Sequence, residues 1–172
     1  VAVLATCMDS GKTTLVCKLA DYFHHNGLNV AGAKLTGVAF MQDPFKMKDA
    51  GIGTVMDFVD AGLPSTCGNP HDAIAAACGV IAEINKTHPD LILAEFGDGI
   101  IGEYNVASIL THPSLKKHII MTIVAANDLV SAWGAKLKME EFGLPVDVFT
   151  GPVVNSQTGV DFIEKNFGVP AE

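Results

Sequence analysis

The sequence contains no arginine, and eleven lysines supply its positive charge. A cation that stabilises a transition state in this chain must therefore be a lysine or a metal ion, unless another chain provides it. Long hydrophobic runs are also missing: no apolar stretch reaches the roughly 18 residues that a membrane span requires, and no signal peptide is recognisable. We therefore expect a cytoplasmic protein without a membrane partner.

The charge balance and the cysteine spacing exclude two further classes of protein. The formal net charge is −8, whereas a nucleic-acid-binding surface needs a basic face, so we expect no nucleic acid partner. The four cysteines form no Cys-x-x-Cys pair and match no zinc spacing. They are Cys7, Cys17, Cys67 and Cys78. This spacing favours reduced thiols in the cytosol over disulfides.

Apolar runs alternate with helical patterns along the whole chain. The expected strands are 1–5, 29–35, 91–95, 119–124 and 146–154, and the expected helices are 12–25, 49–61, 71–86, 128–142 and 159–166. Continuous apolar runs are typical of buried parallel strands, so the pattern predicts an α/β fold: a doubly wound parallel sheet with helices on both faces. The length suits one domain over residues 1–172. Because Val1 already lies in the first strand, we expect a domain excised from a longer chain.

The segment 5–14, between the first strand and the first helix, is the most specific motif. Gly11, Lys12 and Thr13 form the core of a P-loop. Gly11 lets the backbone curl around an oxyanion, Lys12 reaches the outer phosphates, and Thr13 supplies a hydroxyl for Mg²⁺. Thr6 stands where the usual pattern has a glycine. The predicted nucleotide-binding residues in this segment are Thr6, Asp9, Ser10, Gly11, Lys12, Thr13 and Thr14. The alternative is a strand–helix turn with an incidental lysine.

Polar residues follow the other strands at their carboxyl ends, where ligands of such sheets bind. Lys34 and Thr36 are candidates for stabilising a transferring phosphoryl group, together with Lys12 as catalytic residues. Glu95 ends an apolar strand and is a candidate Mg²⁺ carboxylate. Asp43 and Asp49 both lie where a second Mg²⁺ carboxylate is expected, and we favour Asp49. Asp49 opens the expected helix, so its alternative role is that of an N-cap or first-turn acid.

These motifs resemble those of the dethiobiotin synthetase group. Its Gly-Thr-Asp-x-x-x-Gly-Lys-Thr loop is similar to 5–13, and its strand-two lysine is similar to Lys34. Its Ser-Asp-Ala magnesium segment resembles 48–50, and its Val-Glu-Gly-x-Gly-Gly stretch resembles 94–99. Its strand-end asparagine near the adenine is similar to Asn155. The features with which true dethiobiotin synthetases bind diaminopelargonate are not recognisable here, so the substrate stays open.

This resemblance implies a P-loop NTPase fold with ATP and Mg²⁺ as cofactors. The implied metal ligands are Thr13, Asp49 and Glu95, and Asn155 is the implied adenine contact. The guanine-reading Asn-Lys-x-Asp motif is absent, because Asn155 is followed by the Ser-Gln-Thr of 156–158. ATP is therefore favoured over GTP.

The chain also resembles the P-loop half of a two-domain family whose other half is Rossmann-like. The chemistry of that family is largely uncharacterised, with N-acyltransferase activity attributed to some members. Cysteine is frequent there at the position of Cys7, and an Asp-rich helix is similar to 57–60. This resemblance implies a second domain of the same longer chain as a partner; a homo-oligomer is the other expectation.

Three functions fit these observations. The leading hypothesis is an enzyme, an ATP- and Mg²⁺-dependent transferase or ligase that activates a small carboxylated or amine substrate by phosphoryl transfer. That small-molecule substrate would lie against Gly37, Gly97, Asp98 and Gly99. The second hypothesis is a nucleotide switch in which the loop 40–50 orders when the γ-phosphate binds. The third is a structural module with a degenerate loop.

Overall fold

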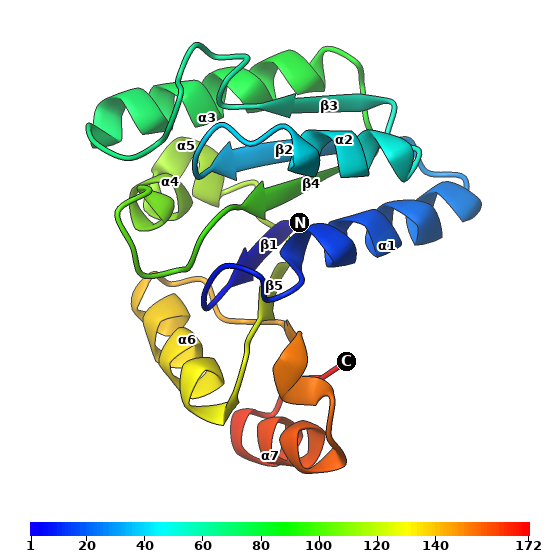
Figure 1. Cartoon of the computed structure of the whole chain (residues 1–172), viewed down its shortest axis with the longest axis vertical. Helices are drawn as coiled ribbons and strands as arrows, with labels where there is room; N and C mark the ends of the chain where they lie inside the picture. The colour runs from blue at the N-terminus through cyan, green and yellow to red at the C-terminus, as the bar shows by residue number, and fades with distance from the viewer.

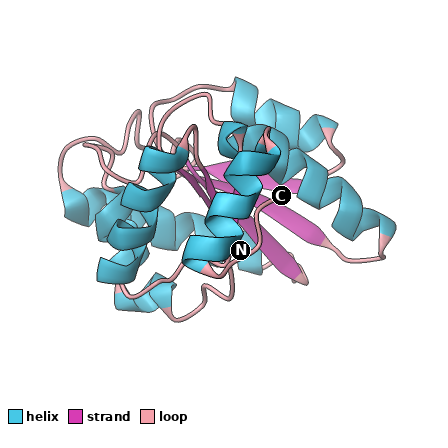
Figure 2. Ribbon diagram, turned by 90° about the horizontal axis from the view of Figure 1, so that it is seen from below, coloured by secondary structure: helices cyan, strands magenta, loops and turns pink.

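A computed structural model describes residues 1–172 of the chain. Its centre is one sheet of six parallel strands in the order β3-β2-β4-β1-β5-β6 (Figure 1). The strands are β1 (Ala2–Ala5), β2 (Val30–Thr36), β3 (Thr54–Asp57), β4 (Leu91–Phe96), β5 (Thr122–Ala125) and β6 (Val148–Thr150). Helices lie on both sides of the sheet (Figure 2). The predicted doubly wound parallel α/β sheet is confirmed.

Helices connect the strands and cover the two faces of the sheet. They are α1 (Lys12–His25), α2 (Gln42–Asp49), α3 (Pro70–Asn85), α4 (Val106–Thr111), α5 (Pro113–Lys116), α6 (Leu129–Glu141), the 3-10 helix η1 (Pro152–Val154) and α7 (Gln157–Phe167). On one face, Val16 of α1 and Met47 of α2 pack with Val3 and Leu93 of the sheet. The opposite face is covered by α3, α4 and α6. No helix is both long enough and apolar enough to cross a membrane.

Strand β1 explains why the strands are unbroken apolar runs in the sequence. All of its residues are buried. Side chains alternate between the two faces of a strand, so Val3 packs on the side of α1 and Leu4 packs in the core on the other side. A strand covered on both faces needs an apolar residue at each position. That requirement makes central parallel strands recognisable.

The helix predicted over 49–61 is wrong. α2 begins earlier, at Gln42, and ends at Asp49, just before Gly51 adopts a left-handed φ of 88°. The next apolar residues form β3, an edge strand that pairs with β2. Asp57 ends β3 and its carboxylate accepts two N–H groups of the following turn. The segment 57–60 is therefore a strand end and a turn, and the Asp-rich helix does not exist.

Other boundaries differ in smaller ways. The strand predicted over 146–154 is interrupted, because Gly151, with a φ of 90°, and Pro152 turn the chain from β6 into η1. The helices α4 and α5 have only six and four residues, too few to produce a periodic pattern. By contrast, α1 has the predicted bounds, and Gly27 stops it with a left-handed φ of 81°.

Candidate functional site

The loop between β1 and α1 is held closed by its own side chains. The buried Ser10 hydroxyl donates to the carbonyl oxygen of Cys7 at 2.9 Å. Lys12 Nζ donates to the same carbonyl at 3.0 Å and to the carbonyl of Asp98, in the loop after β4, at 2.9 Å. Lys12 is buried. The loop therefore has a defined shape, and a lysine ammonium lies at the junction of two strand-end loops.

The same loop carries a row of unpaired backbone N–H groups. None of the N–H groups from residue 7 to residue 14 donates a hydrogen bond within the chain. Asp9 and Gly11 adopt left-handed φ values of 56° and 92°, and such turns aim successive N–H groups at a common point. The first turn of α1 adds its own unpaired donors and the positive end of its dipole. Such a group of unpaired N–H donors has the arrangement with which backbone binds anions such as phosphate.

Four side chains from four different elements meet beside this loop. The Thr13 hydroxyl lies 2.9 Å from Glu95 Oε1 and 3.2 Å from Asp43 Oδ1. Lys34 Nζ donates to the other carboxylate oxygen of Asp43 at 2.7 Å. Lys34 and Glu95 are direct neighbours in the pairing of β2 with β4. Parallel strands thus bring together residues that are far apart in the sequence.

Burial dominates the electrostatics of this cluster. Glu95 is only 2 % exposed, and its Oε2 atom has no hydrogen-bond partner. Burial, followed by the nearby Asp43 carboxylate, raises the pKa of Glu95 to about 7, although the Thr13 hydroxyl and two lysines act in the opposite direction. Burial also lowers the pKa of Lys12. The carboxylates of Asp43 and Glu95, the second with an unpaired buried oxygen, and the Thr13 hydroxyl form a donor set that fits Mg²⁺.

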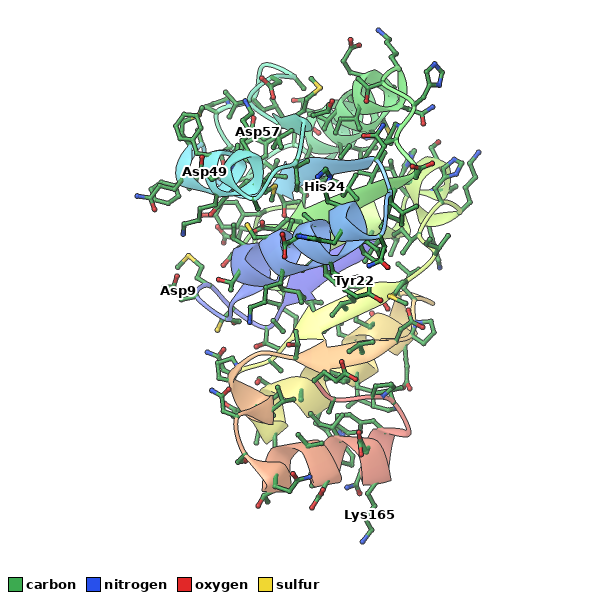
Figure 3. The ribbon with its side chains drawn as sticks, turned by 90° about the vertical axis from the view of Figure 1, so that its right-hand side faces the viewer. Asp9, Tyr22, His24, Asp49, Asp57 and Lys165 are labelled. Carbon is green, nitrogen blue, oxygen red and sulfur yellow. The ribbon has the colours of Figure 1, made fainter.

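A cavity of about 560 Å³ joins the loop and the cluster. It is lined by Met8, Asp9, Gly11, Lys12, Thr13, Thr14, Lys34, Gly37, Val38, Phe40, Gln42, Asp43, Lys46, Glu95, Gly97, Asp98 and Tyr104. These residues come from the carboxyl ends of β1, β2 and β4 and from α1 and α2. Figure 3 shows Asp9 on the loop at the edge of the molecule. The volume is large enough for a cofactor-sized ligand.

The cavity includes ten of the residues that the sequence singled out. They are Asp9, Gly11, Lys12, Thr13, Thr14, Lys34, Gly37, Glu95, Gly97 and Asp98. Six others do not line it: Thr6, Ser10, Thr36, Asp49, Gly99 and Asn155. Asn155 follows η1 and is exposed. Asp49 is the last residue of α2 and is also exposed (Figure 3). Asp43, in the first turn of the same helix, lines the cavity at the position that we expected for Asp49.

Several of the predicted site residues hold together the loops around the cavity. The buried Thr36 hydroxyl donates to the carbonyl of Gly97 at 3.0 Å. A Cβ on Gly97 would lie 2.3 Å from the carbonyl oxygen of Thr36, and a Cβ on Gly99 would lie 2.7 Å from that of Thr6. Neither distance is compatible with a side chain. These two glycines therefore allow the loop after β4 to pack directly against the ends of β1 and β2.

The sequence reasoning missed the cavity wall that α2 forms. Gln42, Asp43 and Lys46 all line the cavity, and their spacing places them on one face of a helix. This helical spacing could be recognised only if a helix had been predicted over 42–49. Phe40, exposed at 50 %, lines the cavity as well. It belongs to a group of aromatic and methionine residues too scattered to interpret from the sequence.

No family model matches the sequence, and no curated protein does. Solved structures do resemble the fold. Cell division protein FtsY from Thermotoga maritima has a TM-score of 0.66 at 19 % identity, over 99 % of this chain and 59 % of its own. Chloroplast FtsY from Physcomitrella patens has a TM-score of 0.66 at 15 % identity, and the match covers 99 % of this chain and 55 % of that protein. The 54 kDa signal recognition particle protein from Aeropyrum pernix K1, solved in complex with GDP, has a TM-score of 0.68 at 14 % identity. That match covers 99 % of this chain and 39 % of that protein.

These likenesses establish the P-loop NTPase fold for a chain that spans at most about three fifths of each neighbour. They correct three expectations. The resemblance to the dethiobiotin synthetase group is supported only at the level of the P-loop class. The hypothesis of an ATP-dependent ligase or transferase acting on a small substrate is wrong, because the neighbours are signal recognition particle proteins and receptors. The preference for ATP is not supported, since the nucleotide in two of these structures is GDP.

Proposed function

We propose that this domain binds GTP with Mg²⁺ and hydrolyses it, and that its α2 segment responds to the γ-phosphate. The observation that carries this proposal is the row of unpaired N–H groups over residues 7–14 beside the buried Lys12. Backbone donors of this kind select an anion, and a lysine at the same point adds the charge that a polyphosphate needs. The GDP of the neighbouring structures supports a guanine nucleotide.

In this proposal, Thr13, Asp43 and Glu95 hold the metal ion. When bound, Mg²⁺ would neutralise charge on the β- and γ-phosphates. The Glu95 Oε2 atom, which has no partner in the nucleotide-free protein, would gain one. The carboxylate of Asp43 would turn from the Thr13 hydroxyl toward the metal, since both of its oxygens already lie at the cavity.

Lys34 is the residue that we propose for stabilising the transferring phosphoryl group. The chain has no arginine to perform this task. Lys34 is buried at the cavity and is held only by Asp43, at 2.7 Å. A change in Asp43 on metal binding would release the Lys34 ammonium toward the γ-phosphate. Preorganised charge in a buried site stabilises a transition state more than the same charge does in water.

The same contacts explain how α2 would act as a switch. Asp43 lies in the first turn of α2, and its two oxygens connect this helix to Thr13 and to Lys34. The state of the γ-phosphate would therefore be transmitted to α2. Phe40 and Phe45, each about half exposed, flank Asp43 and would move with it. Order–disorder changes of such segments are a common way in which nucleotide switches signal to protein partners.

Phosphate release from GTP and from ATP, measured with Mg²⁺, tests this function. We expect turnover with GTP to exceed turnover with ATP. Lys12→Ala should lower GTP turnover by at least about a hundredfold, the effect of losing one preorganised charge donor. Lys18→Ala is the matched control, because Lys18 lies on the same helix but is exposed and does not line the cavity. Equal turnover of the two folded variants would refute the P-loop assignment.

A further inference from the structure

The loop after β4 places one acidic side chain in the cavity between the ends of two neighbouring strands. β4 lies between β2 and β1 in the sheet (Figure 1). Gly97 packs against the carbonyl of Thr36 at the end of β2, and Gly99 packs against that of Thr6 after β1. Both glycines are buried without room for a side chain. Asp98, between them, is therefore the residue of this stretch that presents a side chain, and it lines the cavity.

The backbone of Asp98 has a conformation that glycine adopts more easily. Its φ is 65°, in the left-handed region. Aspartate tolerates this region better than most residues, but only glycine occupies it without a steric cost. Non-glycine residues held in this region are concentrated at functional sites. The conformation of the loop therefore gives no reason for a carboxylate at this position.

The Asp98 carboxylate also has no partner within the chain. Its backbone carbonyl accepts a hydrogen bond from Lys12 Nζ at 2.9 Å, but no hydrogen bond or ion pair involves its side chain. Gly102 leaves this carboxylate uncovered, since even a Cβ there would lie 3.1 Å from Oδ2. Burial lowers the pKa of Lys12, and the charge of Asp98 is among those that oppose this effect. A free acceptor thus lies in the cavity within electrostatic reach of the Lys12 ammonium.

The other carboxylates of the cavity have different positions or tasks. Asp43 and Glu95 both contact the Thr13 hydroxyl and belong to the proposed metal site. Asp9 is exposed on the loop between β1 and α1, at the edge of the molecule (Figure 3). Asp98 is the remaining acid that lines the cavity, and it lies on the wall that the loop after β4 forms.

We propose that Asp98 is a catalytic residue that orients the attacking water and accepts its proton, an inference that rests on the GTP hydrolysis proposed above. The water oxygen forms a bond to the γ-phosphorus. The bond between this phosphorus and the β–γ bridging oxygen breaks, and its electron pair stays on GDP. The proton that the water loses passes to an Asp98 carboxylate oxygen and then to the released phosphate. Orienting the nucleophile is one of the main tasks that phosphoryl transfer leaves to a protein side chain.

GTP turnover and GTP affinity, measured with Mg²⁺, test this role. Asp98→Asn keeps the size of the side chain, and asparagine also tolerates a left-handed φ. It should lower kcat at least about a hundredfold and leave GTP affinity within about threefold of the wild type. Glu103→Gln is the matched control, because Glu103 is an acid of the same loop that is exposed and does not line the cavity. It should change neither quantity, and an Asp98→Asn variant that turns over GTP equally fast overturns the proposal.

Chemical rescue separates a catalytic carboxylate from one that only shapes the loop. Asp98→Gly keeps the backbone conformation, because glycine adopts a φ of 65° freely, and it leaves a space where the carboxylate was. Added formate should restore turnover of this variant in proportion to its concentration, whereas chloride at the same ionic strength should not. Formate that restores no more turnover than chloride overturns the proposal. A wild-type protein without GTP turnover would instead overturn the proposed function, and this role with it.

Discussion

Glu95 gives the sharpest quantitative prediction, because its carboxyl is buried and one of its oxygens has no partner. Its pKa rises from 4.5 to about 7 on folding. Below pH 4.5 the carboxyl is neutral in both states, so no ionisation penalty exists. Between pH 4.5 and 7 the unfolded chain ionises first, and the free energy of unfolding falls as pH rises. The rise in pKa corresponds to about 3 kcal/mol of stability lost by pH 8.

Glu95→Gln should remove this pH-dependent loss while keeping the size of the side chain. Urea unfolding without nucleotide or Mg²⁺, at pH values from about 4 to about 8, measures the effect. At pH 8 the variant should be more stable than the wild type by up to about 3 kcal/mol, and the difference should shrink toward low pH. Glu83→Gln, at an exposed helix position, should show no such trend. A difference between Glu95→Gln and wild type that stays constant with pH would refute the reasoning.

Two further predictions separate the roles of the remaining site residues. Asp43→Asn should raise the Mg²⁺ concentration needed for half-maximal turnover by about tenfold or more, because it removes a proposed metal ligand. Asp49→Asn should leave that concentration unchanged. A Mg²⁺ titration that shifts only for Asp49→Asn would make Asp49 the ligand instead of Asp43. Lys34→Ala should lower GTP turnover by about a hundredfold while leaving GTP affinity within about threefold, and Lys48→Ala, at an exposed position of α2, should change neither. Equal losses in turnover and affinity would make Lys34 a nucleotide-binding residue alone.

The parts of the site that could be predicted are those that local sequence determines. The P-loop motif fixes the turn between β1 and α1, and the stop at Asn26 and Gly27 fixes the end of the helix. Lys34 and Glu95 end buried apolar strands, and parallel strands bring their carboxyl ends to one edge. Lys34 and Glu95 are adjacent because β2 pairs with β4. The sequence pattern did not reveal this order of strands in the sheet.

The segment after β2 could not be predicted for a physical reason. α2 has no side-chain cap at Met41, so no residue marks its start. β3 has four residues and lies at an edge of the sheet, so its pairing with β2 decides its conformation rather than its own propensity. The apolar residues from 50 to 59 fit a helix or a strand equally well. Because the prediction placed a helix over 49–61, it favoured Asp49 over Asp43 as the second Mg²⁺ carboxylate.

The reaction could not be read from these motifs either. A P-loop, a strand-end lysine and a strand-end acid occur together in enzymes with different second substrates, because one fold supports many chemistries. The resemblance to a ligase rested on short segments. The likeness to FtsY and to the signal recognition particle protein spans 99 % of the chain.

Residue-resolved amide hydrogen exchange with and without GTP and Mg²⁺ tests the central claim most directly. In the nucleotide-free protein, the N–H groups of residues 7–14 donate no hydrogen bond within the chain, so they should exchange rapidly. Bound phosphates should accept hydrogen bonds from them and slow their exchange by at least about tenfold, while exchange in α6 stays unchanged. Bound nucleotide that leaves the exchange of residues 7–14 unaltered, or saturating GTP that protects no amide, would contradict the account.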